Sequence, residues 1–436
     1  MKNGKLKIKI LTRFARDTYA FGVILLLLTA FCFLLTSQAE AKWQTDERLT
    51  NASGVSEHPQ ILASGKDLHV VWADSREGDM EIYYKRRSLK GRVPTWSEDV
   101  RLTFASGTSY DPKIAINQDG MHVVWFDNRD GRYQVYYKSC SLNLDPTKSE
   151  NWTADINLSN TSQDAKYPGL ATSQDSLSLV WEEGGEIYFK HYRAGVWGSA
   201  VKLTSTGGKT YNPDIAIDQR GIHIVWFDNR EGTYKIYYKM CPAGSDPEVL
   251  SSWSQDLRLS DVNSVAYNPA INAFDSGLQV VWEDSREGNR KIYYKRCKAD
   301  LDPTNILKWS NDIKLIYEEG IAYHPALASD DNGIHIVFED NREGDYKIFY
   351  KMLPGTRNGS KIENWSPDVK ISDTPSEYPA LTTSDSGIYI AWGDSRNGNS
   401  EIYLKENDMK ELTLLNARVG GVLVRDLLIL LTILLF

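Results

Sequence analysis

Cysteine is scarce in this sequence, with four in 436 residues. Three of them, Cys140, Cys241 and Cys297, stand at the same point of a repeated segment, two residues after a Tyr-Tyr-Lys triplet. Equivalent positions in stacked β-sheets lie at least ~10 Å apart, which is beyond the reach of a disulfide bond. We therefore predict free thiols rather than a disulfide framework.

Clusters of positive charge and metal-ligand spacings are also missing. Lys and Arg number 50 against 58 Asp and Glu, a net charge of -8, so nucleic acid is not an expected partner. His69, His122, His223 and His335 each precede a repeated aromatic residue by three positions, without acidic or cysteine neighbours at metal-ligand spacing. We expect them to be hydrogen-bonded within strands, and we expect no metal and no cofactor.

Long apolar runs occur only near the two ends. Residues 1–41 combine six basic residues, an apolar run and the small-residue sequence SQAEA, which is the layout of a signal peptide, with an uncleaved membrane anchor as the alternative. Residues 411–436 end in ten residues without a charge, about half of a bilayer core if helical. For this tail, membrane association, a helix packed on the rest of the chain and a removed anchor signal stay open. We expect an extracytoplasmic protein that is secreted, periplasmic or at the cell surface.

The sequence does contain a phrase of about thirty residues that recurs seven times. Each copy reads as four short strands between turn signals, and in the second copy these are residues 113–116, 121–126, 134–140 and 155–158. Four strands per repeat of this period are typical of a propeller blade. We predict an all-β fold, a seven-bladed β-propeller over residues 42–410. A proline precedes the aligned aromatic residue of every copy by thirteen positions, and these aromatic residues are Trp72, Trp125, Trp181, Trp226, Trp282, Phe338 and Trp392.

A second marker, of the type WSQDLRLS, separates the copies and is circularly permuted. Its seventh occurrence, WQTDERLT from Trp43, comes before the first phrase instead of after the last. We predict that residues 46–50 form the outermost strand of the last blade and close the ring, which removes free sheet edges. Residues 411–416 are a competing candidate for this place.

An Asp-x-Arg-x-Gly hairpin follows the aromatic residue in six of the seven copies. Glycine permits the positive φ of a hairpin loop, and Asp with Arg can form a geometrically fixed pair. Sixfold repetition favours a structural clamp, whereas the functional alternative is a ring of guanidinium groups that attracts an anion. The third copy departs from the pattern, with Glu182 and Glu183 and no arginine. The arginines retained as ligand-binding candidates are Arg129, Arg230, Arg286 and Arg342.

The loop leading into each first strand carries aromatic and polar residues on the same face as these hairpins. A tyrosine presents a flat apolar face with a polar tip, which suits sugar rings or peptides, and the alternative is packing against the adjacent proline. The candidates are Tyr110, Tyr211, Tyr267, Tyr323 and His324.

The repeated phrase G-x-H-x-V-W-x-D-x-R-x-G-x-x-x-I-Y-Y resembles the repeats of sialidase-like (BNR-type) propellers, and more loosely those of the Tol-system periplasmic propeller. The resemblance covers residues 43–405 and implies a propeller fold. Sialidases use an arginine triad, a Tyr-Glu nucleophile pair and an Asp acid/base, and they carry S-x-D-x-G-x-x-W boxes that this sequence lacks. We therefore assign no catalytic residues. We expect a binding module or scaffold whose partner is a glycan, an anionic small molecule or a protein, with a sialidase-like glycoside hydrolase as the alternative.

Overall fold

The computed structural model describes residues 43–88, 95–355, 357–408, 418–419 and 422–423. Thr45–Glu406 form one compact unit, and a second unit comprises Met1–Gln44 and Asn407–Phe436. In the second unit, β31 (Arg418–Val419) pairs antiparallel with β32 (Val422–Leu423). No helix among the described residues is long and apolar enough to cross a membrane. The signal peptide or anchor predicted over 1–41 lies outside the described residues, as does most of the tail 411–436.

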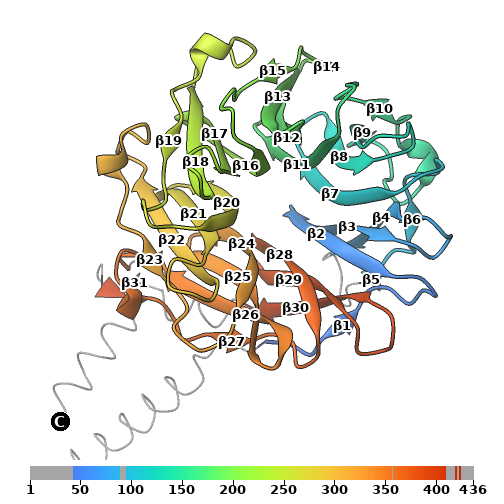
Figure 1. Cartoon of the computed structure of the whole chain (residues 1–436). Helices are drawn as coiled ribbons and strands as arrows, with labels where there is room; N and C mark the ends of the chain where they lie inside the picture. Colours follow the sequence, from blue (N-terminus) through green and yellow to red (C-terminus); the bar gives the residue numbers. More distant parts are fainter. Residues whose placement is uncertain (1–42, 89–94, 356, 409–417, 420–421, 424–436) are drawn as a thin grey trace, which may run out of the picture. The chain divides into compact units, whose positions relative to one another are not determined.

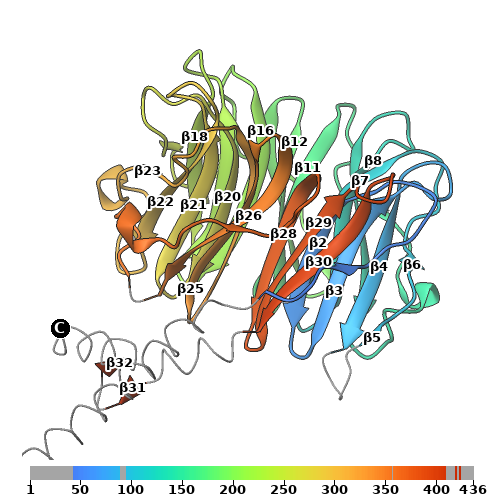
Figure 2. The same cartoon turned by 90° about the horizontal axis from the view of Figure 1, so that it is seen from below.

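The unit Thr45–Glu406 is a ring of seven antiparallel sheets, the blades, each with its first strand nearest the centre (Figure 1). Figure 2 shows the strands crossing the ring from one face to the other. The first three blades consist, from the centre outward, of β2 (Ser56–Ser64), β3 (Asp67–Asp74), β4 (Glu81–Ser88), β5 (Thr95–Trp96) and β6 (Val100–Arg101); β7 (Ser109–Ile116), β8 (Gly120–Asp127), β9 (Gln134–Ser141) and β10 (Ile156–Asn157); and β11 (Ala165–Thr172), β12 (Ser176–Glu183), β13 (Glu186–Arg193), β14 (Val196–Trp197) and β15 (Val201–Lys202).

The remaining blades repeat this order, with a single short outer strand in each. In blades one and three, by contrast, two short segments both pair with the third strand. Blades four to seven are β16 (Thr210–Asp218), β17 (Gly221–Asp228), β18 (Lys235–Pro242) and β19 (Leu257–Arg258); β20 (Ala266–Phe274), β21 (Gly277–Asp284), β22 (Lys291–Lys298) and β23 (Ile313–Lys314); β24 (Ala322–Asp330), β25 (Gly333–Glu343), β26 (Asp345–Pro354) and β27 (Val369–Lys370); and β28 (Ser376–Ser384), β29 (Gly387–Asp394), β30 (Glu401–Asp408) and β1 (Glu47–Arg48).

The predicted seven-bladed propeller is confirmed, and so is its closure by the N-terminal segment. β1 pairs with β30 in the register Glu47↔Leu404 and Arg48↔Tyr403. The next backbone bond, from Leu49 N to Ile402 O, is 2.8 Å long. The competing residues 411–416 lie outside the described part of the chain.

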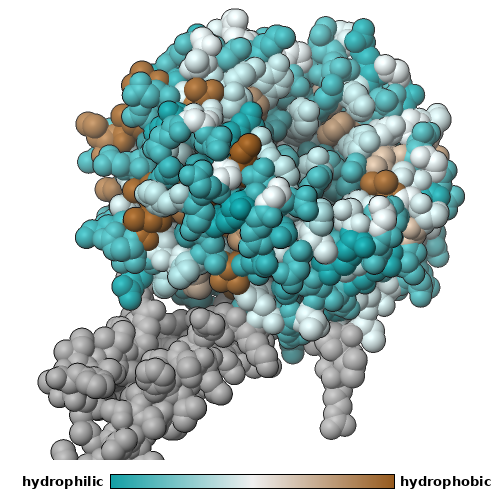
Figure 3. Space-filling view, turned by 60° about the horizontal axis from the view of Figure 1, so that its bottom comes forward, coloured by the Kyte–Doolittle hydropathy of each residue, from teal (hydrophilic) through white to brown (hydrophobic). Residues whose placement is uncertain are grey.

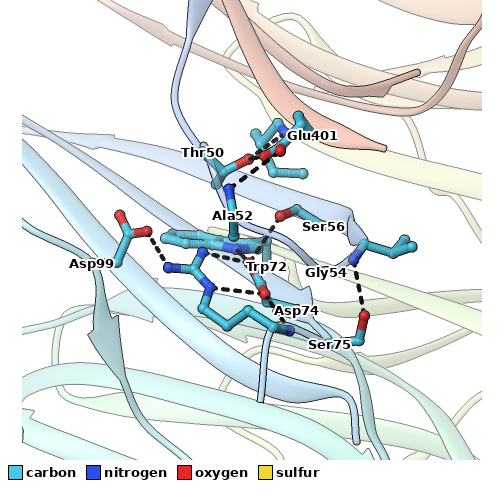
Figure 4. A network of polar contacts seen from close by, with 12 residues as sticks. Thr50, Ala52, Gly54, Ser56, Trp72, Asp74, Ser75, Asp99 and Glu401 are labelled. Carbon is cyan, nitrogen blue, oxygen red and sulfur yellow. Dashed lines mark hydrogen bonds and ion pairs between the residues drawn. The ribbon is translucent and has the colours of Figure 1, made fainter. Parts of the chain in front are cut away.

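A buried carboxylate holds this closing segment to the last blade (Figure 4). Glu401 is fully buried, and one of its oxygens accepts a hydrogen bond from Arg48 Nη2 at 2.7 Å. The same carboxylate accepts bonds from the Thr50 hydroxyl and from Ala52 N. A buried charge persists only when it is paired and hydrogen-bonded, so these contacts fix the N-terminal segment in one register.

The core lies between the blades, where each second strand is buried on both faces. All eight residues of β8 are buried, as are those of β17, β21 and β29. The repeated tryptophans are fully buried. On the face in Figure 3, by contrast, hydrophobic residues are scattered among hydrophilic ones.

The predictions for cysteine and histidine are confirmed among the described residues. Cys140, Cys241 and Cys297 are free and buried, and burial raises the pKa of Cys241 and Cys297 to about 11. The four strand histidines each share a hydrogen bond of 2.7–2.9 Å between Nδ1 and a tyrosine hydroxyl on the next strand, in the pairs His69–Tyr84, His122–Tyr137, His223–Tyr238 and His335–Tyr350.

Candidate ligand-binding cavity

The inner strands of all seven blades surround a central cavity of about 820 Å³. Prolines of six of the seven inner strands line it, together with aliphatic side chains such as Ile114, Leu170 and Leu381. Polar and aromatic residues from the start of each inner strand line it as well. A cavity of this size, lined by aromatic, aliphatic and polar residues in similar measure, is within the size range of small-molecule sites.

A backbone irregularity at the start of every inner strand supplies seven of the lining residues. The register of the first two strands shifts at this point in each blade. The residue before the proline adopts a left-handed conformation, with φ between 43° and 54°. Such a conformation costs a non-glycine residue of order 1–3 kcal/mol and persists where the surroundings enforce it. The seven residues, all of which line the cavity, are His58, Asp111, Tyr167, Asn212, Asn268, His324 and Tyr378.

Four rings on neighbouring blades form a continuous series along one side of the cavity. The centroids of Tyr110 and His58 are 6.2 Å apart, those of His58 and Tyr378 are 3.9 Å apart and stacked, and those of Tyr378 and His324 are 5.0 Å apart. All four residues line the cavity. We call Tyr110, His58, Tyr378 and His324 the ring arc. It offers the aromatic faces on which a planar or sugar-like ligand stacks.

The pKa values of the two histidines of the ring arc are shifted in opposite directions. Burial lowers the pKa of His58 to about 4, so this ring is neutral. Burial also acts to lower the pKa of His324, but its 2.9 Å hydrogen bond from Nδ1 to Glu339 outweighs that effect and raises the pKa. The His324 side chain is 40% exposed, which leaves its ring accessible from the cavity.

Charged residues also line the cavity. Lys113 Nζ lies 2.5 Å from Asp111 Oδ1. Asp214, whose pKa burial raises, accepts a hydrogen bond of 2.8 Å from Ile271 N of the next blade. Lys113 and Asp214 each follow the repeat proline of their blade, as Gln60 does in blade one. In the other blades this residue is small: Gly169, Ala270, Ala326 and Ala380.

The arginines predicted as candidates are held in ion pairs away from this cavity. In blade two, Arg129 lies 2.6 Å from both Asp127 and Asp155, with its guanidinium 4.3 Å from the centre of the Tyr136 ring. Lys138 binds the other oxygen of Asp155 at 2.8 Å. The same arrangement recurs at Arg76, Arg230, Arg286, Arg342 and Arg396.

None of these six arginines lines the cavity. Their contacts agree with the structural clamp that sixfold repetition favours. Blade three lacks the clamp, and it has Ala200 where the other blades have the outer aspartate.

Three of the predicted tyrosines also lie outside the cavity. Tyr211 packs against Phe227, with centroids 5.5 Å apart. The Arg290 guanidinium stacks on Tyr267 at 4.1 Å and on Tyr323 at 5.1 Å. Of the nine sequence candidates, the structure therefore brings only Tyr110 and His324 into the cavity.

Sequence reasoning did not select the other two members of the ring arc or the other polar residues that line the cavity. His58 and Tyr378 precede the repeat proline, as His324 does. The signal that could have identified them is the position directly before the repeat proline. At this position the bulge points one residue of each blade toward the cavity. Asp111, Asn212 and Asn268 share it.

No protein-family model matches the chain, and no curated protein matches its sequence. Among solved structures, the polysaccharide lyase Uly1 is similar with a TM-score of 0.51 and 11% identity, over 85% of this chain and 100% of the lyase. An α-L-arabinanase of Penicillium chrysogenum has a TM-score of 0.45 and 11% identity, over 85% of this chain and 99% of that one. A Trypanosoma rangeli sialidase has a TM-score of 0.45 and 12% identity, over 85% of this chain and 60% of the sialidase. The likeness to the lyase shows a shared propeller fold, as the repeats predict.

Proposed function

We propose that the central cavity binds a glycan and that one sugar ring stacks on the ring arc. The observation that carries the proposal is the continuous series Tyr110, His58, Tyr378 and His324 along one side of the cavity. Sugars present apolar C–H faces and hydroxyl rims, and aromatic rings together with polar groups in one cavity suit both.

The polar groups of the cavity supply the hydrogen bonds that a sugar requires. Asn212 and Asn268 are joined by a bond of 2.7 Å from Nδ2 to Oδ1. Asn268 also donates to Glu283 at 2.8 Å. Amides tied in this way have fixed orientations, and pre-organised donors and acceptors raise affinity by lowering the ordering cost of binding.

The charges of the cavity favour a glycan over a simple anion. The arginines that would attract an anion are paired with two carboxylates each, and Lys113 is paired with Asp111. Asp214 adds a further acidic group. Uly1, which shares the fold, is named as a polysaccharide lyase, and a polysaccharide is a glycan, which agrees with the proposal. We place the activity outside the cytoplasm because of the signal-like residues 1–41.

Calorimetric titration of the full chain with a panel of neutral, acidic and amino-sugar oligosaccharides tests the proposal. Tyr378→Ala should weaken binding of the best ligand by roughly 2- to 13-fold, because an aromatic stacking contact contributes about 0.5–1.5 kcal/mol. Tyr317→Ala is the matched control, since Tyr317 is 63% exposed and does not line the cavity. Absence of binding across the panel, or equal loss in the two variants, would refute the proposal. Release of shortened sugars whose new ends are saturated would instead establish the hydrolase alternative, because hydrolysis adds water across the broken bond.

A further inference from the structure

Two buried carboxylates stand behind the cavity lining, at a repeat position where the fold does not require a charge. The position between the repeat aromatic residue and the hairpin aspartate is Glu283 in blade five and Glu339 in blade six, with side chains 0% and 4% exposed. Four other blades have an uncharged residue there, namely Ala73, Phe126, Phe227 and Gly393. A buried charge is unfavourable unless it is paired and hydrogen-bonded, so these two carboxylates have a role that the blade itself does not impose.

Each carboxylate holds lining residues of two neighbouring blades. Glu283 Oε1 accepts a hydrogen bond of 2.8 Å from Asn268 Nδ2 in its own blade and one of 3.0 Å from His324 N in the next. Glu339 Oε1 accepts a bond of 2.9 Å from His324 Nδ1 in its own blade and one of 2.5 Å from Tyr378 N in the next. Asn268, His324 and Tyr378 all line the cavity, whereas neither glutamate does. The two carboxylates therefore act on the cavity through three consecutive lining residues.

These contacts also determine which polar atoms remain for a ligand, because a carboxylate accepts hydrogen bonds and cannot donate them. Asn268 turns Nδ2 to Glu283, so its Oδ1 accepts from Asn212 Nδ2 at 2.7 Å and Asn212 Oδ1 is left over. His324 turns Nδ1 to Glu339, so its Nε2 is left over. Neither leftover atom has a hydrogen-bond partner in the described part of the chain, and neither is among its buried atoms that lack one. Both belong to lining residues and are open to a molecule in the cavity.

We propose that Glu283 and Glu339 are positioning residues for glycan recognition, and that the glycan makes its polar contacts with Asn212 Oδ1 and His324 Nε2. This inference rests on the proposed glycan-binding function and names the atoms through which it works. Asn212 Oδ1 accepts a hydrogen bond from a sugar hydroxyl group. His324 Nε2 carries a proton and donates it in a hydrogen bond to a sugar oxygen, while the sugar ring stacks on the ring arc.

The charge of His324 sets the direction of its bond to the sugar. Burial acts to lower the pKa of His324, but Glu339, followed by Glu283 and Glu377, outweighs burial and raises it. A raised pKa widens the pH range in which Nε2 is a donor. The titratable and charged groups around His324 are Tyr323 of its own strand, His58 of β2, Glu283 and Arg290 of β21 and its hairpin, Glu339 of β25, and Glu377 and Tyr378 of β28.

The test is calorimetric titration of the full chain with maltotetraose, tetra-N-acetylchitotetraose and tetragalacturonic acid, none of which titrates between about pH 5 and about pH 9. The affinity for the tightest of the three should fall about tenfold as the pH rises through the pKa of His324, because a hydrogen bond from a charged donor is lost. Glu339→Gln keeps an acceptor oxygen but removes the charge, so the fall should occur about one pH unit lower. Glu319→Gln alters an exposed carboxylate outside the cavity and should leave the profile unchanged.

A second variant tests the acceptor on blade four without disturbing the charges. Asn212→Gly removes Oδ1 and tolerates the backbone φ of 43° at this residue. It should weaken the same tetrasaccharide by roughly 2- to 13-fold, the contribution of one hydrogen bond. Because an amide does not titrate, the loss should be equal at every pH.

The outcomes separate this inference from the proposed function. An affinity that does not change with pH, or a fall at the same pH in the parent and in Glu339→Gln, would overturn the roles of His324 and Glu339. An unchanged affinity in Asn212→Gly would overturn the role of Asn212 and, with it, that of Glu283. The glycan-binding function would survive either result if Tyr378→Ala still weakened binding. If none of the three tetrasaccharides bound, both proposals would fall together.

Discussion

Removal of the Arg286 guanidinium should destabilise the propeller by about 3 kcal/mol. Arg286 Nη2 lies 2.5 Å from Asp284 Oδ2 and 2.7 Å from Asp312 Oδ2. The Asp284 side chain is fully buried, so Arg286→Ala leaves a buried charge without its cation. Loss of one partner of a buried pair costs about 3–5 kcal/mol.

We expect the lower end of that range because three donors to Asp284 remain. Trp282 Nε1 donates to it at 3.0 Å, and the backbone N–H groups of residue 286 and of Val265 donate at 2.9 Å and 3.4 Å. For a unit of roughly 360 residues, an unfolding entropy of about 2.1 cal/mol/K per residue converts 3 kcal/mol into a fall in Tm of roughly 4 °C.

The assay is thermal unfolding of the full chain by circular dichroism, with Arg132→Ala as the control because Arg132 is exposed on a hairpin. The double variant Asp284→Asn with Arg286→Ala should recover part of the loss, since it no longer buries a charge. A fall in Tm of less than 1 °C for Arg286→Ala, or no recovery in the double variant, would refute this account of the clamp.

The same pair has a predictable pH dependence. Burial acts to raise the pKa of Asp284, but its hydrogen bonds from Arg286 and Trp282 outweigh that effect and lower it. A carboxyl group whose pKa is lowered by folding contributes stability above its unfolded value, and that stability is lost as the pH falls through the folded value. The difference in Tm between the parent and Arg286→Ala should therefore shrink below about pH 4.

Three further predictions concern the ring closure and the cavity. Deletion of residues 43–50 should lower the free energy of unfolding by several kcal/mol, because it exposes the third strand of blade seven and leaves Glu401 without its partners Arg48 and Thr50. An unchanged melting curve would contradict the closure. Asn212→Val should lower Tm by a few degrees because a β-branched residue is strained at φ 43°, whereas Asn212→Gly should shift it little; equal effects would contradict the enforced conformation. Glu57→Gln should raise Tm at pH 7 and not at pH 4, because folding raises the pKa of Glu57 and its charged form is the unfavourable one; a lower Tm at pH 7 would show that this carboxylate serves the fold.

The fold was predictable because its signals are local and repeated. Each blade has its proline, its tryptophan and its hairpin at fixed spacing, so strand order and register follow from one copy. In blade two the predicted strands 113–116, 121–126 and 134–140 correspond to β7, β8 and β9. The closure of the ring was equally predictable. The marker sequence is missing after the last copy and present before the first, so the N-terminal marker is expected to supply the missing strand of the last blade.

The site was harder to predict because it depends on which of two adjacent side chains faces the axis. Tyr323 and His324 are neighbours, yet Tyr323 stacks beside Arg290 while His324 lines the cavity. Successive residues of a strand point to opposite sides, and the bulge before each proline shifts that alternation by one residue. The pattern of apolar and polar residues does not reveal such a shift, so tyrosines were favoured over the residues that follow them.

The closing clamp joins the two most distant parts of the propeller sequence, and this has a consequence for how the chain assembles. Arg396 bonds to Asp46 at 2.8 Å across 350 positions, whereas the corresponding Arg286 and Asp312 are 26 apart. The loop-closure entropy grows as about (3/2)RT ln n, so joining the first pair costs about 2 kcal/mol more than joining the second. Blades one to six can each complete soon after their own residues are synthesised. Blade seven completes only when its own strands have been synthesised and the N-terminal segment docks on them. That segment has to stay unpaired until nearly the whole chain has emerged. Its final docking is therefore the slowest step of assembly and the step at which a foreign strand could take its place.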